Sequence, residues 1–169
     1  MKRTALALLA IAGVASLPVA AQADDVALPL RKAGRWEQKT TMDEGGQKHE
    51  QALTICIDAD MERNTAAASD VEHKRSCSAY EVKKDGEKVV VEATCKMNGR
   101  DVESRTEMSG DFQSAFAVKI TSTTSGLQDS QSVAIKRVIE QEGRYLGESC
   151  GDLKAGEAMG SDGTKIMVQ

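Results

Sequence analysis

Hydrophobic and polar residues alternate along the stretch from Cys77 to Thr124, and three short turn motifs interrupt this alternation. The turns are Asp85-Gly86, Asn98-Gly99 and Ser109-Gly110-Asp111. Asp-Gly and Asn-Gly between alternating runs are strong hairpin signals, because a type I′ turn needs positive φ at both central residues. The pattern therefore predicts four consecutive antiparallel strands.

The register of these strands follows from parity, because successive side chains of a strand point to opposite faces. Two-residue turns at the first two motifs and a three-residue loop at the third predict the pairs Val82–Val89, Tyr80–Val91, Val91–Thr106, Cys95–Val102 and Met108–Phe112. All three connections then place the apolar side chains on one inner face. The opposite face carries charged residues, as expected for a sheet that is solvated on one side: Asp101, Glu103, Arg105 and Glu107.

Further strands are predicted over Arg35 to Met42, Gln47 to Ile57 and Gln131 to Glu142. Asp58 is expected to cap a short helix that ends near Arg63, followed by a polar, alanine-rich segment up to Ser76. The predicted fold is an all-β domain over residues 34–150, a curved antiparallel meander or partly closed barrel of about seven strands. A two-sheet sandwich is the alternative.

The two ends of the chain have a different character. Lys2 and Arg3, an apolar run and Ala21-Gln22-Ala23 have the pattern of a secretory signal peptide over residues 1–23, with cleavage after Ala23. The apolar run is shorter than the roughly 20 residues that a membrane span needs. Residues 24–33 are expected to form an extended arm, and residues 151–169 a flexible tail with room for a short edge strand at Lys165 to Val168. We therefore expect a periplasmic protein without a transmembrane segment in its mature form.

Charge and aromatic content bear on the partners. The formal net charge is −4, and it becomes −6 when Lys2 and Arg3 are removed with the signal peptide. No cluster of Lys and Arg stands out, which argues against nucleic acid as a partner. Aromatic residues make up only 3% of the chain, and single-stranded nucleic-acid sites rely on aromatic platforms.

The four cysteines, Cys56, Cys77, Cys95 and Cys150, predict two disulfides in an exported chain. Regular alternation points Cys95 inward and Cys77 outward, which disfavours a Cys77–Cys95 bond and with it Cys56–Cys150. The preferred pairs are Cys56–Cys77 and Cys95–Cys150. The pairs Cys56–Cys95 and Cys77–Cys150 remain open.

Several short motifs, taken in order, resemble a known family. They are Leu30-Arg31-Lys32-Ala33-Gly34-Arg35-Trp36-Glu37, Cys56, Cys77, Cys95, Met108-Ser109-Gly110-Asp111-Phe112, Tyr145-Leu146-Gly147 and Cys150. The chain resembles the small exported bacterial proteins of domain-of-unknown-function family 3617 over most of Leu30 to Cys150. The resemblance implies an exported, cysteine-paired, β-rich domain and supplies no catalytic residues.

Candidate chemistry is sparse. A zinc site could use His73 with thiolates such as Cys77, but an oxidising compartment converts these thiols to disulfides first. His49 and His73 both stand in polar settings typical of the surface, and nothing resembles a nucleophile elbow. The carboxylates Asp101, Glu103 and Glu107 fit a solvated strand face better than an acid–base pair. We expect no catalytic residues, no metal ligands and no cofactor.

The inner face nevertheless includes small and polar residues beside its apolar ones: Ala93, Ser104, Thr106 and Ser114. A curved sheet with such residues can leave a ligand cavity in its mouth. Trp36 and Tyr145 are the candidates for its rim. We therefore expect a non-catalytic module that binds a small ligand or an envelope protein, with an envelope hydrolase and a periplasmic metal carrier as alternatives. The sequence carries no signature for the ligand or for the oligomeric state.

Overall fold

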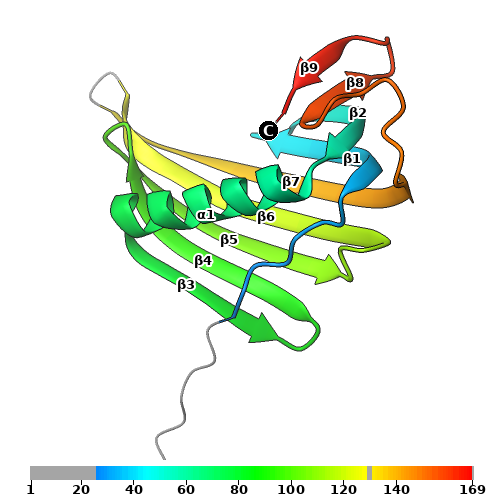
Figure 1. Ribbon diagram of the computed structural model, residues 1–169. Helices are drawn as coiled ribbons and strands as arrows, with labels where there is room; N and C mark the ends of the chain where they lie inside the picture. Colours follow the sequence, from blue (N-terminus) through cyan, green and yellow to red (C-terminus); the bar gives the residue numbers. More distant parts are fainter. Residues whose placement is uncertain (1–25, 129–130, 169) are drawn as a thin grey trace, which may run out of the picture.

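The computed structural model describes residues 26–128 and 131–168, which form one antiparallel sheet and one helix (Figure 1). The predicted signal peptide lies outside the described residues. The elements are β1 (Gly34–Glu44), β2 (Gln47–Ile57), α1 (Ala59–Ser76), β3 (Cys77–Asp85), β4 (Lys88–Met97), β5 (Arg100–Gly110), β6 (Ala115–Gln128), β7 (Gln131–Gly147), β8 (Glu157–Gly160) and β9 (Lys165–Met167).

The sheet is all-antiparallel, as predicted, but larger than expected. In the described part of the chain it has nine strands, in the order β3-β4-β5-β6-β7-β1-β2-β8-β9, rather than about seven. The sheet curves around α1 and is not closed, since β3 and β9 are its two edges (Figure 1). The fold is therefore an open, curved sheet with a helix on its inner side, rather than a barrel.

The central hairpin has the predicted register. Asn98 and Gly99 both have positive φ, of 51° and 76°, as a type I′ turn requires. The observed pairs across this hairpin include Val91–Thr106 and Cys95–Val102, as predicted. The turn chemistry alone was sufficient here, because a two-residue loop leaves no freedom in the pairing.

The two flanking connections keep the predicted face but shift the register. The first turn is Gly86-Glu87, so Val82 pairs with Val91 and Tyr80 with Ala93, each two residues further along β4 than predicted. The third connection is longer than three residues, and Met108 pairs with Val118 instead of Phe112. Each register shift is an even number of residues, so the side chains that face inward are the ones predicted.

Phe112 lies in this longer loop and turns back into the protein. Its φ is +56°, unusual for an aromatic residue, and its side chain is only 6% exposed. The Asp111 carboxylate accepts backbone N–H bonds from Gln113, Ser114 and Ala115 at 2.9, 2.8 and 3.1 Å. These bonds hold the loop in the shape that sends Phe112 to the core.

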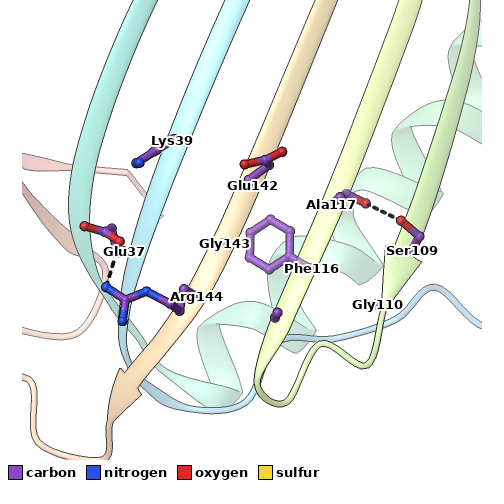
Figure 2. Close-up of a pocket in the computed structure, with 10 residues that line it drawn as sticks. Glu37, Lys39, Ser109, Gly110, Phe116, Ala117, Glu142, Gly143 and Arg144 are labelled. Atoms are coloured by element: carbon purple, nitrogen blue, oxygen red, sulfur yellow. Dashed lines mark hydrogen bonds and ion pairs between the residues drawn. The ribbon is translucent and has the colours of Figure 1, made fainter.

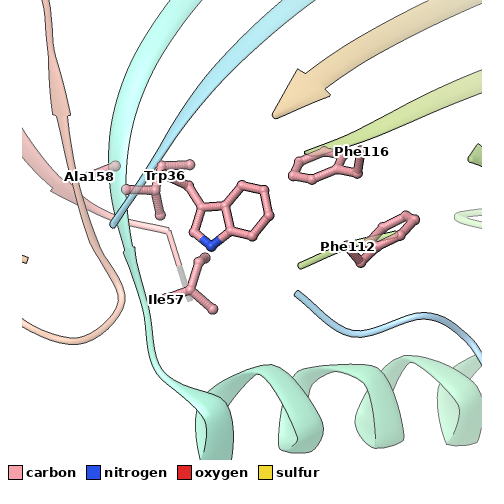
Figure 3. Packing of buried hydrophobic residues seen from close by; sticks show 6 residues of the cluster. Trp36, Ile57, Phe112, Phe116 and Ala158 are labelled. Atoms are coloured by element: carbon pink, nitrogen blue, oxygen red, sulfur yellow. The ribbon is translucent and has the colours of Figure 1, made fainter. Parts of the chain in front are cut away.

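The core lies at one end of the sheet, where strands from both halves of the chain meet (Figure 3). Its buried members are Trp36, Ile55, Ile57, Phe112, Phe116 and Ala158. The Phe112 and Phe116 rings stack at 5.3 Å, and Trp36 lies 5.5 Å from Phe116. Gly143 lets this packing form, because a Cβ at that position would lie 2.0 Å from Cε1 of Phe116.

Helix α1 is much longer than the short helix predicted from the sequence. It runs from Ala59 to Ser76 without interruption, and Asp58 caps it as expected by accepting bonds from the N–H groups of Asp60 and Met61. Alanine is the best helix former, and acidic residues in the first turn and basic ones in the last favour the helix dipole. The sequence pattern concealed the helix because α1 has no apolar stripe to bury.

The disulfides correct the preferred pairing. Cys56 is bonded to Cys150, and Cys77 to Cys95, with Cα–Cα distances of 5.4 and 3.7 Å. The register shifts between Cys77 and Ala79, so the extra residue reverses the parity at the start of β3. Cys77 therefore faces inward, directly opposite Cys95, where regular alternation would have pointed it outward.

The segment after Cys150, for which a flexible tail with room for an edge strand was expected, contains two short strands. β8 pairs with β2, and β9, at the predicted edge position, pairs with β8. Ala158 is fully buried and Leu153 is 8% exposed. The segment folds because its few apolar side chains cover the free edge of β2. Within the described residues, no helix combines the length and apolar character needed to span a membrane.

Candidate functional site

The inner face of the sheet carries rows of apolar side chains that cross several strands. One row consists of cross-strand neighbours from β3 to β1: Val82, Val91, Thr106, Ile120, Ile139 and Met42. All six are only half-buried. The next row, toward the core, adds Val89, Met108 and Val118, which are also half-buried. The inner face is therefore apolar but not fully covered.

Helix α1 covers this face with polar side chains. The half-buried helix positions include Glu62, Ala66, Asp70 and His73, which share one face at helical spacing, and no residue of α1 is buried. The helix packs chiefly against β3 and β4. A polar helix above an apolar sheet cannot seal it by hydrophobic packing, so the sheet beside the helix remains accessible.

A cleft of about 280 Å³ lies between the sheet, the helix start, the N-terminal arm and the C-terminal segment. Its lining residues are Arg31, Gln38, Leu53, Ile55, Glu62, Phe112, Phe116, Val118, Gln141 and Val168. The sheet supplies apolar side chains such as Leu53, Ile55 and Val118 to the floor, with Gln38 and Gln141 on the same face beside them, and Arg31 and Glu62 come from the arm and the helix. Binding sites for small molecules have this combination of an apolar lining with a few polar groups.

The charged groups of the cleft are Arg31 and Glu62, which form a bidentate ion pair. Nε of Arg31 donates to Oε1 of Glu62 at 2.8 Å, and Nη2 donates to Oε2 at 2.7 Å. Their side chains are 20% and 11% exposed. Nη1 of Arg31 also donates to Oε1 of Gln38 at 3.3 Å. The pair ties the arm to the helix start and places a cation and an anion side by side at the wall.

The cleft lies almost entirely in a region shared with other proteins. Residues 31–150 match the family model described as protein of unknown function (DUF3617). The chain belongs to this family. No curated protein and no solved structure matches the chain. Among the lining residues of the cleft, only Val168 lies outside the matched region of this DUF3617 protein.

Trp36 and Tyr145, which were expected at the rim of a ligand cavity, lie elsewhere. Trp36 is 1% exposed, and its indole N–H donates to the carbonyl of Lys32 at 2.8 Å. It lies in the core next to Phe116, a lining residue of the cleft. Tyr145 is half-buried, donates to the carbonyl of Ala33 at 3.2 Å and has the Lys32 ammonium 4.6 Å from its ring centroid. Neither lines the cleft.

Sequence reasoning missed the polar residues of the cleft. Gln38 and Gln141 belong to predicted strands, and their parity places them among the apolar inner positions, a signal that was available. Arg31 and Glu62 had no such signal, because their approach depends on how the arm and the helix pack on the sheet.

A second hollow, of about 480 Å³, lies on the outer face of the sheet (Figure 2). Ala115 and Ala117 form part of its floor, and Glu37, Lys39, Glu142 and Arg144 are at its sides. Glu37 and Arg144 are paired at 3.0 Å and are 40% and 68% exposed. The hollow is larger than the cleft, and its lining also includes apolar side chains, but it lies on the charged face of the sheet, where its ion pair is more exposed than the Arg31–Glu62 pair. The cleft is therefore the stronger candidate.

The histidines and acidic residues considered as chemical groups occupy other surroundings. His73 stacks on Tyr80 at 5.0 Å, and His49 is exposed on β2. All four cysteines are in disulfides, and the described residues contain no group of three or more His, Cys, Asp or Glu arranged to hold a metal ion.

Glu107 of the predicted acidic stripe is part of an ion-pair network on the outer face, and Asp101 of the same stripe pairs with Lys96. Arg105 bonds to Glu92 and Glu107, Lys83 to Glu92 and Lys88 to Glu107. Hydrogen bonds from Lys83 and Arg105 lower the pKa of Glu92, and those from Lys88 and Arg105 lower the pKa of Glu107. A general acid needs a raised pKa, so these groups have the character of a solvated, ion-paired strand face.

Proposed function

We propose that this protein is an exported, non-catalytic binding module whose ligand is a small molecule with an apolar body. The ligand lies in the cleft between α1 and the inner face of the sheet. The observation that carries the proposal is the mismatch between a half-buried apolar sheet face and the polar helix above it.

Burial of the floor would supply the binding free energy. Removing apolar surface from water contributes about 25 cal/mol per Å². A ligand that covers only ~100 Å² of the floor would therefore gain about 2.5 kcal/mol, before the cost of immobilising it. The curved sheet holds the floor in place, so little ordering of the protein is needed.

Export is supported by the cysteines. Both disulfides link residues of the matched region, and no free cysteine is present among the described residues. Disulfides persist in oxidising compartments such as the bacterial periplasm. Together with the signal-peptide pattern at the N-terminus, this favours a periplasmic location.

The cleft can be tested with Nile red, a neutral dye that fluoresces in apolar surroundings. The oxidised protein should raise its fluorescence in a saturable manner, and Val118→Gln should weaken binding about tenfold, because a polar amide on the floor must be desolvated. Val133→Gln is the matched control. Val133 is also half-buried, but it pairs with Gly126 at the far end of β7.

Native mass spectrometry of protein purified from periplasm provides the second measurement. A retained small molecule, displaced by Nile red, is the expected result. Equal dye binding by both variants would contradict the cleft as the site. A co-purified envelope protein with no small molecule would favour a protein partner over the proposed ligand.

A further inference from the structure

The cleft combines two features that together define a class of ligand. Among the described residues that line it, the charged ones are Arg31 and Glu62, which have opposite sign and are in direct contact. Its remaining polar residues, Gln38 and Gln141, are neutral amides. The cleft therefore has no net charge, but it has a positive and a negative group side by side.

The apolar floor continues beyond the cleft. Val118 is followed on the same face of β6 by Ile120, which pairs with Ile139, and Ile139 in turn pairs with Met42. Two residues along a strand span about 7 Å and two strand spacings, at right angles to this, about 10 Å, so Val118 and Met42 lie roughly 12 Å apart. The strip is roughly as long as one acyl chain, which fills half of a bilayer core of about 30 Å. β6, β7 and β1 are not the strands that α1 packs against most closely.

We propose that the cleft binds a single-chain amphiphile with a zwitterionic headgroup. Its chain lies on the strip from Val118 toward Met42, its anionic group faces Arg31 and its cationic group faces Glu62. This inference rests on the proposed function and names its ligand class. Like-charge juxtaposition costs several kcal/mol, so a purely anionic headgroup is opposed by Glu62 and a purely cationic one by Arg31.

The occupant is a single amphiphile rather than a membrane surface. Adsorption to anionic membranes uses clusters of Lys and Arg. Helix α1, which borders the cleft, instead mixes both signs: Asp60, Glu62, Arg63, Asp70, Glu72, Lys74 and Arg75. The site is also a recess under a helix, which fits one chain better than a flat bilayer.

Four probes with the same alkyl chain separate the headgroups: decylphosphocholine, decanoate, decyltrimethylammonium and decyl maltoside, each below its micelle-forming concentration. Trp36, the only tryptophan of the chain, is the reporter, because its ring lies 5.5 Å from Phe116 in the wall of the cleft. Calorimetry confirms the affinities. Decylphosphocholine should bind about tenfold or more tightly than decanoate and decyltrimethylammonium.

Two charge variants test the contact itself. Glu62→Gln should shift the preference toward decanoate, and Arg31→Gln toward decyltrimethylammonium, each by about tenfold. Glu37→Gln is the control, since it removes one member of the Glu37–Arg144 pair on the outer face of the same sheet. Circular dichroism and thermal unfolding verify that each variant is folded.

The outcomes separate the two proposals. Equal affinity for all four headgroups would overturn the zwitterionic assignment, but the proposal that the cleft binds an apolar ligand body would remain. If the charge variants behave like Glu37→Gln, the headgroup is not at Arg31 and Glu62. Binding to phosphatidylcholine vesicles without binding to monomeric probes would replace the single amphiphile by a membrane surface. If neither Nile red nor any decyl probe binds, the proposed function itself fails.

Discussion

At the scale of single residues, a few positions determine how the core closes. Gly143 faces Phe116 across β6 and β7, and the aromatic ring occupies the space where a Cβ would be. Such a ring over a strand glycine fills the gap that the glycine leaves and tightens the pairing. The same ring forms part of the wall of the cleft, so this glycine helps to position the site.

Gly143→Ala should therefore destabilise the fold. A Cβ 2.0 Å from Cε1 of Phe116 requires the ring to move, and overpacking of this kind costs about 1–3 kcal/mol. Urea unfolding of the oxidised protein gives the measurement. Gly126→Ala is the control, because the atoms nearest to its Cβ belong to the flexible Arg100 side chain, the closest at 2.9 Å. A similar unfolding midpoint for both variants would contradict this account of the core.

Asp111 gives a prediction about pH. Hydrogen bonds from the N–H groups of Ser114, Ala115 and Gln113 and from the Ser114 hydroxyl hold the pKa of its carboxyl well below the usual range. A lowered native pKa stabilises the fold above the unfolded-state pKa of about 3.9, and this stabilisation is lost as the pH falls below that value.

Asp111→Ala should accordingly lower the urea midpoint at pH 7, and by a smaller amount at pH 3. The loop that carries Phe112 loses its acceptor in the variant at both pH values. At pH 3, however, the wild-type carboxyl begins to take up a proton in the unfolded chain while it stays charged in the native one, so the native carboxylate contributes less stability than at pH 7. Asp152→Ala, at another exposed carboxylate, is the control. An equal loss at both pH values would show that the carboxylate charge is not what stabilises the loop.

At the scale of elements, helix α1 is unusual because it has little packing of its own. The disulfides hold it at both ends: Cys56 lies two residues before the cap Asp58, and Cys77 follows the last helical residue. Covalent ends allow a helix without buried residues to stay above an apolar sheet. We infer that the disulfides hold α1 in position beside the cleft, where it forms one border without filling the space.

Replacing both Cys77 and Cys95 by Ser should therefore loosen the C-terminal half of α1. The disulfide closes a loop between residues 18 apart, and such a loop contributes about 3 kcal/mol in the chain-entropy model. Hydrogen exchange followed by mass spectrometry should show faster exchange in α1, with strands β5 to β7 still protected. Unchanged exchange in α1 would mean that packing against β3 and β4 is enough to hold it.

At the scale of the whole molecule, the sheet carries a different surface on each side. The outer face is an ion-paired, solvated surface, and even Val90, fully buried there, lies between the long side chains of Lys83 and Glu107. The inner face is apolar, curved and incompletely covered. Exposed apolar surface of this kind is typical of interaction sites, and both binding proposals rest on this difference between the two faces.

The sequence by itself determined the all-β class, the family, the inward face of each meander strand and the register of the central hairpin. These features depend on local alternation and on the backbone requirements of one two-residue turn, which are encoded within a few residues.

Only the tertiary structure decided the rest. The bulge after Cys77 reversed the parity of one residue and changed the disulfide pairing, and the long loop at Asp111 brought Phe112 to the core. Arg31 and Glu62 meet across 31 residues of sequence because the arm and the helix both cross the inner face. Such contacts between distant segments depend on packing geometry, which no local pattern encodes.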